Sequence, residues 1–336
     1  MKAKMVKIAV ALTCHNRREK TLRCVKSLIE SQVYHNNTAC QNNSVKLDFI
    51  IADSGSTDGT KRLLETLEYP VTILDCPPDY FWNAGMGKAL SYILTQQEQY
   101  DFCLLVNDDV DFFPEAVGLL LEVWSRRNSI AYEPHSLKLN GFEAGTETAN
   151  NVREKANEQA TAGLDGQPKA VPLGEEGSSD LAACVIVGPV CSHSGEMSYG
   201  GIRKKSDFLA KFEMVQPHAS GRIDTFNGNC VLLPLSLLAR FGTPDPEYVH
   251  SMADFDYGFA FSKAGVPIYQ CKGFVGECED NPVKGSWRDK SLSIKERLRK
   301  KENPKGLPAK DWFYFVKKNY GLMPALYHTL TPYIRI

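Results

Sequence analysis

Apolar runs of strand length alternate with amphipathic segments over the first 130 residues, and the connections between them are short. Segments in this order usually form strands joined by crossover helices, with the strands parallel in one sheet. The predicted strands are 6–13, 47–52, 71–74 and 102–106, and the predicted helices are 17–31, 57–67, 84–97 and 114–126. The pattern therefore predicts an α/β fold with a mostly parallel central sheet flanked by helices.

The pattern changes after residue 130. Residues 134–180 are rich in Glu, Gly, Ala, Asn, Gln and Ser and show no periodicity, so we expect a flexible insertion there. Extended segments are predicted at 181–187, 196–202, 224–233 and 266–271, a helix at 251–264, a basic helix at 294–301 and an aromatic segment at 312–315. We expect one domain, 1–280, with halves 1–130 and 181–280, followed by a helical extension, 281–336.

Composition excludes several classes of protein. The 336 residues hold 39 Lys and Arg against 40 Asp and Glu, a balance that argues against a nucleic-acid partner. The ten cysteines form no C-x-x-C pair, and Cys103, Cys184, Cys230 and Cys271 lie in or beside apolar runs, as buried thiols in a reducing compartment do. The longest apolar stretch, 181–191, is too short to cross a bilayer. We therefore expect a cytoplasmic protein.

The predicted strand 102–106 ends in Asn107, Asp108 and Asp109, with Asp111 close behind. Carboxylates on the rigid edge of a sheet are hard oxygen ligands, suited to a divalent cation that bridges phosphates. The alternative is a solvated acidic turn.

A second carboxylate, Asp53, closes the predicted strand 47–52 and begins a Gly-rich turn, 53–60. A carboxylate at the end of a parallel strand is well placed to accept hydrogen bonds from a ribose or a base. The alternative is a capped turn with no ligand.

Six motifs occur in the order and with the spacing of those in the family 2 glycosyltransferases of GT-A fold, and the chain resembles this family. Within the family, it resembles the bacterial rhamnosyltransferase-like members. The resemblance covers roughly residues 5–130 and 185–275. The motifs are Thr-Cys-His-Asn-Arg at 13–17, Ala-Asp-Ser-Gly-Ser-Thr-Asp-Gly-Thr at 52–60, Asn-Ala-Gly-Met-Gly-Lys-Ala at 83–89, Asn-Asp-Asp at 107–109, Phe-Asn-Gly-Asn-Cys-Val-Leu-Leu at 226–233, and Ala-Asp-Phe-Asp-Tyr at 253–257 with Lys-Ala-Gly at 263–265.

The resemblance implies a role for each motif. Asp109 would bind Mg²⁺ or Mn²⁺ at the donor diphosphate, and Asp254 would be the general base. Asn229 and Asp256 would lie on the acceptor side, with support of its helix as the alternative for Asp256. The implied donor-binding residues are Thr13, His15, Asn16, Asp53, Ser54, Trp82, Asn83, Gly85 and Asp108.

Two departures from the family pattern affect the metal site. Asn107 replaces the usual first Asp of the acidic motif, and the His that commonly follows the last core strand is missing. The segment there contains Glu277, which suits a hard cation, and Cys278, which is a soft ligand. Glu277 is therefore the candidate further ligand.

The resemblance implies transfer of a sugar, with inversion, from a nucleotide diphosphate-sugar to a hydroxyl of a glycan or a lipid-linked acceptor in polysaccharide assembly. The alternatives are a nucleotidyltransferase, whose usual Gly-rich first turn is absent here, and a catalytically inert glycan- or partner-binding module. The basic run 284–301 and the aromatic segment 312–315 suggest peripheral contact with anionic lipid on the inner face of the plasma membrane. The alternative is a tail helix packed on the core.

Overall fold

The structure is a computed structural model, and it describes residues 5–38, 44–127 and 183–336. The chain divides into two units, residues 1–133 with 182–336 and residues 134–181. The predicted insertion 134–180 lies outside the described residues. Every element given below belongs to the first unit.

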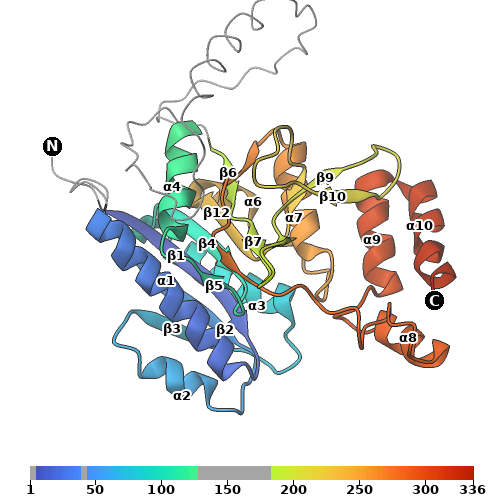
Figure 1. Ribbon diagram of the computed structural model, residues 1–336, viewed down its shortest axis with the longest axis horizontal. Helices are drawn as coiled ribbons and strands as arrows, with labels where there is room; N and C mark the ends of the chain where they lie inside the picture. The colour runs from blue at the N-terminus through green and yellow to red at the C-terminus, as the bar shows by residue number, and fades with distance from the viewer. Residues whose placement is uncertain (1–4, 39–43, 128–182) are drawn as a thin grey trace, which may run out of the picture. The chain divides into compact units, whose positions relative to one another are not determined.

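A seven-stranded sheet runs through this unit in the order β13-β6-β12-β4-β1-β2-β3 (Figure 1). Its strands are β1 (Val6–Cys14), β2 (Val45–Asp53), β3 (Val71–Asp75), β4 (Phe102–Val106), β6 (Val185–Val187), β12 (Cys230–Pro234) and β13 (Ile268–Gln270). Only the two pairings of β12, with β4 and with β6, are antiparallel among the strands of this sheet. The predicted α/β class with a mostly parallel sheet is confirmed.

Helices cover both faces of the sheet because the strands are apolar on both faces. In β1, Ile8 and Val10 pack with α1 (Arg18–Thr38) and α4 (Ala116–Arg127). Ala9 and Ala11 pack on the other face with α3 (Trp82–Thr95), α6 (Leu235–Phe241) and α7 (Ala253–Lys263). Two shorter elements are α2 (Thr60–Glu65) and a 3-10 helix, η1 (Gln97–Gln99). Helix α1 extends seven residues past the predicted end, and α2 is shorter than predicted because it begins only after Gly59.

Two small sheets complete this unit. One contains β5 (Asp111–Phe112), β14 (Gly276–Glu277), β7 (Val190–Cys191) and β8 (Met197–Tyr199); the other contains β10 (Phe212–Met214), β9 (Gly201–Lys204) and β11 (Thr225–Phe226). The segment predicted as one strand at 196–202 is therefore two strands, β8 and β9, in different sheets. They separate at Gly200, where a Cβ would lie 2.4 Å from Met197 Cε. Likewise, 224–233 divides into β11 and β12.

The C-terminal extension is helical, as predicted, with α8 (Ile294–Lys301), α9 (Ala309–Tyr320) and α10 (Leu322–Ile334). Ser293 and Glu296 form a capping box that fixes the start of α8. The aromatic segment 312–315 lies in α9, where Trp312 and Phe315 are buried against Phe259 of α7. This segment therefore packs on the core, which was the alternative to lipid contact.

The described cysteines are all buried, and no disulfide joins any of these nine residues. Across the described ranges, no helix is long and apolar enough to cross a membrane.

Candidate active site

The register of the central sheet brings the predicted motifs to one edge. Cys14 at the end of β1 is paired with Asp53 at the end of β2, and Val106 at the end of β4 is paired with Cys230 at the start of β12. The four loops that meet at this edge are 14–17, 53–59, 107–110 and 227–229. Segments up to about 200 residues apart in sequence are thus placed around one site.

The loops after β1 and β2 are joined by hydrogen bonds. Asn16 has a left-handed backbone (φ 50°); its N–H donates to Ser56 Oγ (2.9 Å), and its Oδ1 accepts from the Thr57 N–H (2.7 Å). His15 Nδ1 lies 2.7 Å from the carbonyl oxygen of Ser54. His15, Asn16 and Ser54 therefore shape this loop pair, and their contact with a donor stays a prediction.

Asp53 is buried at the base of the same loops. Its Oδ1 accepts a hydrogen bond from the Ser56 N–H (3.0 Å), and the Cys14 thiol lies 3.8 Å from the same oxygen. Burial, together with the charge of Asp53, raises the pKa of the Cys14 thiol. Among the described residues, Oδ2 has no hydrogen-bond donor, so this oxygen remains open to a ligand.

Arg17 bridges the acidic motif. One guanidinium nitrogen, Nη1, lies 2.7 Å from Asp108 Oδ1 and 2.9 Å from Asp109 Oδ2. Asp108 is buried and also accepts from the Thr21 hydroxyl (3.1 Å). Burial raises the pKa of Asp108, and the charge of Arg17 opposes that shift. Asp108 thus holds Arg17, whereas Asp109 is more exposed.

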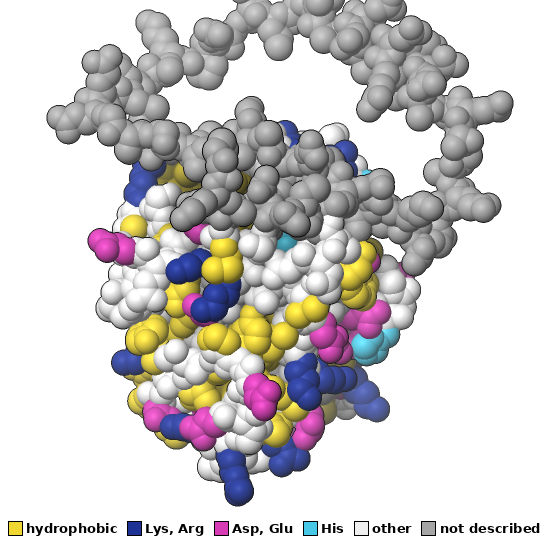
Figure 2. Space-filling model, turned by 90° about the vertical axis from the view of Figure 1, so that its left-hand side faces the viewer, with side chains coloured by type: hydrophobic (Ala, Val, Ile, Leu, Met, Phe, Trp, Pro, Cys, Tyr) yellow, Lys and Arg dark blue, Asp and Glu magenta, His cyan; other side chains and the backbone are white. Residues whose placement is uncertain are grey.

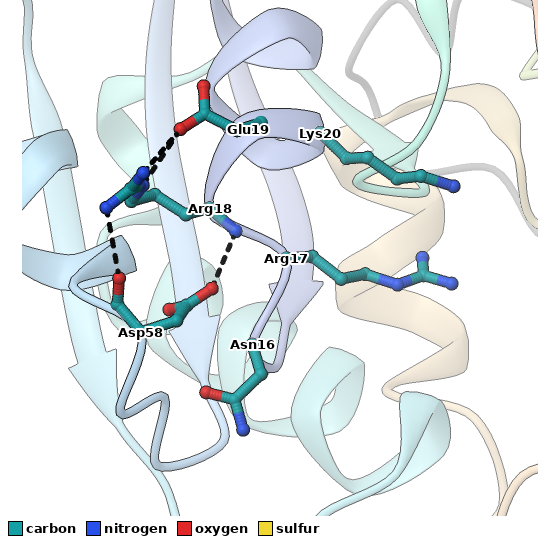
Figure 3. A pocket seen from close by; sticks show the side chains of 6 residues that line it. All are labelled: Asn16, Arg17, Arg18, Glu19, Lys20 and Asp58. Carbon is teal, nitrogen blue, oxygen red and sulfur yellow. Dashed lines mark hydrogen bonds and ion pairs between the residues drawn. The ribbon is translucent and has the colours of Figure 1, made fainter.

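Arg17 was part of the matched first motif but was not among the predicted site residues. The available signal was a cation in the turn after β1, at the edge that also gathers the acidic motif. Figure 3 shows the shallow pocket beside it: Arg18 turns toward Asp58 and Glu19, while Arg17 and Lys20 extend toward the other side. The backbone N–H of Arg18 donates to Asp58 Oδ2 (3.0 Å), which ties the start of α1 to the β2–α2 loop.

Asp254 lies in the first turn of α7, after Met252, whose φ is 69°. Its carboxylate accepts from the Gly228 N–H (3.0 Å) and from the Phe255 N–H (2.8 Å). Burial raises the pKa of Asp254 to about 6, although both hydrogen bonds act in the opposite direction. This pKa is close to that of an effective general base near neutral pH.

Trp82 connects Asp254 with the acidic motif. Its indole Nε1 donates to Asn107 Oδ1 (2.8 Å), and its ring lies against Gly228, where a Cβ would be 2.6 Å from Cζ2. The same Cβ would be 3.4 Å from Cβ of Asp254. The structure therefore brings together the predicted residues Trp82 and Asp254 with Asn107.

Asn83 and Gly85 both have structural contacts within the protein. The Asn83 amide donates to the carbonyl oxygens of Asp245 (2.8 Å) and Tyr248 (2.7 Å), so it holds the loop before α7. At Gly85, a Cβ would lie 2.8 Å from Thr13 Cγ2, so the glycine allows α3 to approach β1. Donor contacts of Thr13, Asn83 and Gly85 stay predictions.

Asp256, predicted on the acceptor side, is buried in the contact between α7 and α9. It accepts from Lys318 Nζ (2.7 Å) and from Asn319 Nδ2 (2.9 Å). These contacts favour the alternative, support of its helix.

The residue that faces Asp109 is Cys278. Its Sγ lies 3.6 Å from Asp109 Oδ1 and 3.8 Å from Nδ2 of buried Asn229. Burial and the nearby Asp109 raise the pKa of Cys278 to about 12, so it remains a thiol. Glu277, the predicted further metal ligand, instead lies 2.9 Å from His193 Nδ1. Binding of one metal ion by both Asp109 and Glu277 therefore stays a prediction, and none of these contacts supports it.

His250 is a further polar residue of this region that the sequence reasoning did not select. Its Nδ1 is buried and has no hydrogen-bond partner within the described part of the chain, and its ring lies 6.1 Å from that of Phe81. Burial lowers the pKa of His250 to about 4, and the charges of Lys305 and Arg17 act in the same direction. The imidazole is therefore neutral at physiological pH.

Comparison with solved structures finds likenesses at low sequence identity. Staphylococcus aureus TarS 1-349 in complex with UDP is 14% identical with a TM-score of 0.47, covering 98% of this chain and 80% of that one. The mannosyltransferase PcManGT from Pyrobaculum calidifontis, in complex with GDP-Man and Mn²⁺, is 13% identical with a TM-score of 0.46, covering 97% and 72%. These likenesses assign no substrate. No curated protein matches the chain.

A sequence profile of one family does match: the family described as Glycosyl transferase family 2, over residues 9–146. The matched segment includes three of the four loops that form the site edge, those after β1, β2 and β4. The segment 9–146 is therefore similar to the glycosyltransferases of family 2.

Proposed function

We propose that this protein moves a sugar from a nucleotide diphosphate-sugar to a hydroxyl of a glycan or lipid-linked acceptor, with inversion at the anomeric carbon. The observation that carries the proposal is the Trp82 bridge. It joins the acidic end of β4, suited to a diphosphate, to the raised-pKa carboxylate of Asp254, suited to an acceptor hydroxyl.

The loops after β1 and β2 are suited to binding the nucleotide of the donor. Oδ2 of Asp53 is open to accept a hydrogen bond from a ribose or a base, because the internal bonds of the turn use Oδ1. Arg17 lies beside this loop and over the acidic motif, so its guanidinium is positioned to neutralise charge on a diphosphate.

A divalent cation fits this site only if the substrate supplies most of its ligands. No cluster of three His, Cys, Asp or Glu suited to a metal occurs in the described ranges. Mg²⁺ commonly takes one or two carboxylates together with substrate phosphates and water, and Asp109 offers one such carboxylate. When bound, Mg²⁺ or Mn²⁺ would stabilise charge on the leaving diphosphate. Arg17 would then turn from Asp109 toward the diphosphate.

At the acceptor end, Asp254 would take the proton from the attacking hydroxyl. The N–H groups of Gly228 and Phe255 hold its carboxylate in place, and Trp82 packs beside it. In a single displacement the hydroxyl attacks from the face opposite the leaving nucleotide, which inverts the anomeric configuration.

A panel of nucleotide sugars, including an activated rhamnose, tests the proposal without a known acceptor. We expect slow release of nucleoside diphosphate from at least one donor, faster with Mn²⁺ than with a chelator. Once an acceptor is found, proton NMR of the product should show the opposite anomer. Retention of configuration would contradict single displacement, and the absence of nucleotide-sugar binding would contradict the donor assignment.

A further inference from the structure

Helix α10 presents an apolar stripe to solvent. Side chains three or four positions apart share one face of a helix. Six such residues are between 51% and 83% exposed: Leu322, Met323, Leu326, Tyr327, Leu330 and Ile334. The opposite face is buried, with Ala325 and His328 against α9. The helix Leu322–Ile334 contains no Asp, Glu, Lys or Arg.

This concentration is unusual for the molecule. Sixteen large apolar side chains are exposed in the described part of the chain, and seven of them lie on α10. Two more, Ile294 and Leu298, lie one turn apart on α8. Arg297 of α8 donates to the carbonyl oxygens of Ile336 (2.6 Å) and Arg335 (2.9 Å), so the two helices are held together. We call the exposed side of this pair the α8–α10 face.

The charge of the extension that carries this face is predominantly positive. Residues 281–336 contain 13 Lys and Arg and 4 Asp and Glu, a net charge of +9 in a chain whose net charge is −1. Two of the acidic residues are already engaged: Glu296 in the capping box of α8, and Glu302 with Lys301 and Tyr333. Lys295, Arg299 and Arg335 are exposed.

The opposite side of the described unit is different. Helix α1 lies at the far end from α10 (Figure 1), and the face on that side carries hydrophobic, basic and acidic side chains interspersed (Figure 2). Its basic side chains lie among acidic ones, whereas the extension has a net charge of +9.

We propose that the α8–α10 face binds the surface of an anionic lipid membrane, with α10 lying in the interface plane. An uncharged apolar stripe beside exposed cations is the pattern of an interfacial helix. At 1.5 Å per residue, α10 is about 20 Å long, too short to span. A second copy of this chain is disfavoured as the occupant, because it would bring a second net charge of +9 to the same contact.

The proposal goes beyond the proposed function and does not depend on it. Its consequence for function comes from α9, which packs between α10 and α7; Lys318 of α9 binds Asp256 of α7, two residues from Asp254. A membrane-bound α10 would therefore hold the acceptor end of the site at a fixed orientation to the lipid surface.

Sedimentation of the full chain with vesicles tests this proposal. We expect binding to vesicles of phosphatidylcholine with one quarter phosphatidylglycerol, weak binding to phosphatidylcholine alone, and loss of binding as salt increases. The double variant Leu326→Gln/Leu330→Gln should weaken the vesicle partition coefficient by about tenfold or more, since both exposed leucines would enter the interface. Lys295→Gln/Arg299→Gln should weaken binding to anionic vesicles only, by about tenfold.

The matched control is Val33→Gln, which alters an apolar side chain of α1 that is 49% exposed and should leave vesicle binding unchanged. Equal binding of wild type and the Leu326→Gln/Leu330→Gln variant would overturn the proposal. So would a wild-type chain that ignores vesicles and forms a dimer in light scattering that this variant abolishes. Donor hydrolysis by both double variants should equal that of wild type without vesicles, which separates this proposal from the catalytic one.

Discussion

At the residue scale, Arg17 is the cation that stabilises the carboxylates of the acidic motif at the end of β4. It contacts buried Asp108 and the more exposed Asp109 through one nitrogen. Arg17→Gln should lower the free energy of unfolding by about 1–3 kcal/mol, because it leaves a buried carboxylate without its partner while the Arg17 side chain itself is partly exposed.

The direction in which the stability of the variant changes with pH tests this explanation. Without Arg17, burial and the charge of Asp109 are opposed only by the hydrogen bond from Thr21, so the pKa of Asp108 should rise further and the ionised form should be penalised. The difference in stability between Arg17→Gln and wild type should therefore decrease as pH falls and Asp108 becomes protonated. Urea unfolding at several pH values measures this, and a difference that is constant from acidic to neutral pH would argue against the pair.

Protonation of Asp254 should cause the loss of activity at acidic pH, the acid limb of the pH–activity profile. Its pKa is about 6 because of burial, and a general base acts only when ionised. We expect kcat/KM to fall about tenfold per pH unit below that value. The limb should be missing from the residual activity of Asp254→Asn; an unchanged limb in this variant would assign it to another group.

The sequence made Asp53, Asp109 and Asp254 candidates for the site, because each stands in a motif at the end of a predicted element, and the structure places all three near one edge of the sheet. It did not identify the contact of Cys278 with Asp109. Side chains alternate between the two faces along an extended segment, so neighbours such as Glu277 and Cys278 point in different directions, and a register uncertain by one residue leaves open which of them faces Asp109. The link from Trp82 to Gly228 depends on tertiary packing, which no local pattern encodes.

At the element scale, two glycines of α3 form a matched pair. At Gly85 a Cβ would lie 2.8 Å from Thr13 Cγ2, whereas at Gly87 nothing lies within 4 Å. Gly85→Ala should destabilise the protein by about 1–3 kcal/mol, since α3 must move away from β1. Gly87→Ala should stabilise it by about 0.5–1 kcal/mol through helix propensity.

Thermal unfolding of the two variants checks the pair. Because α3 carries Trp82, the displacement in Gly85→Ala should also reduce activity, and Gly87→Ala should retain it. Equal effects of both substitutions on stability would mean that close packing of α3 on β1 is not what Gly85 provides.

The sequence pattern predicted the bounds of β4 and α8, 102–106 and 294–301, as the structure has them. It missed strands of two residues, such as β5 and β14, because two residues show no period. The bounds of α9 were not predicted within the helical extension, because Trp, Phe and Tyr are consecutive in this helix and it has no side-chain cap at its start.

At the scale of the whole molecule, the parallel half of the sheet follows from the repeated strand–helix order. The position of β12 does not, because it pairs antiparallel with β4 more than 120 residues earlier. This pairing places Gly228 and Asn229 beside the acidic motif, and α7 then brings Asp254 to Gly228. The site thus joins the segment that the family profile matches with a second segment beyond residue 182.

The measurement that most directly tests the account separates donor binding from turnover in Asp254→Asn. The substitution keeps the size of the side chain and one acceptor oxygen, so calorimetry should give a nucleotide-sugar affinity close to that of wild type. Sugar transfer should fall by about 10²–10⁴-fold, as expected for loss of a general base. A loss of donor affinity in proportion to the loss of rate, or a rate close to that of wild type, would contradict the assignment of Asp254 as the base.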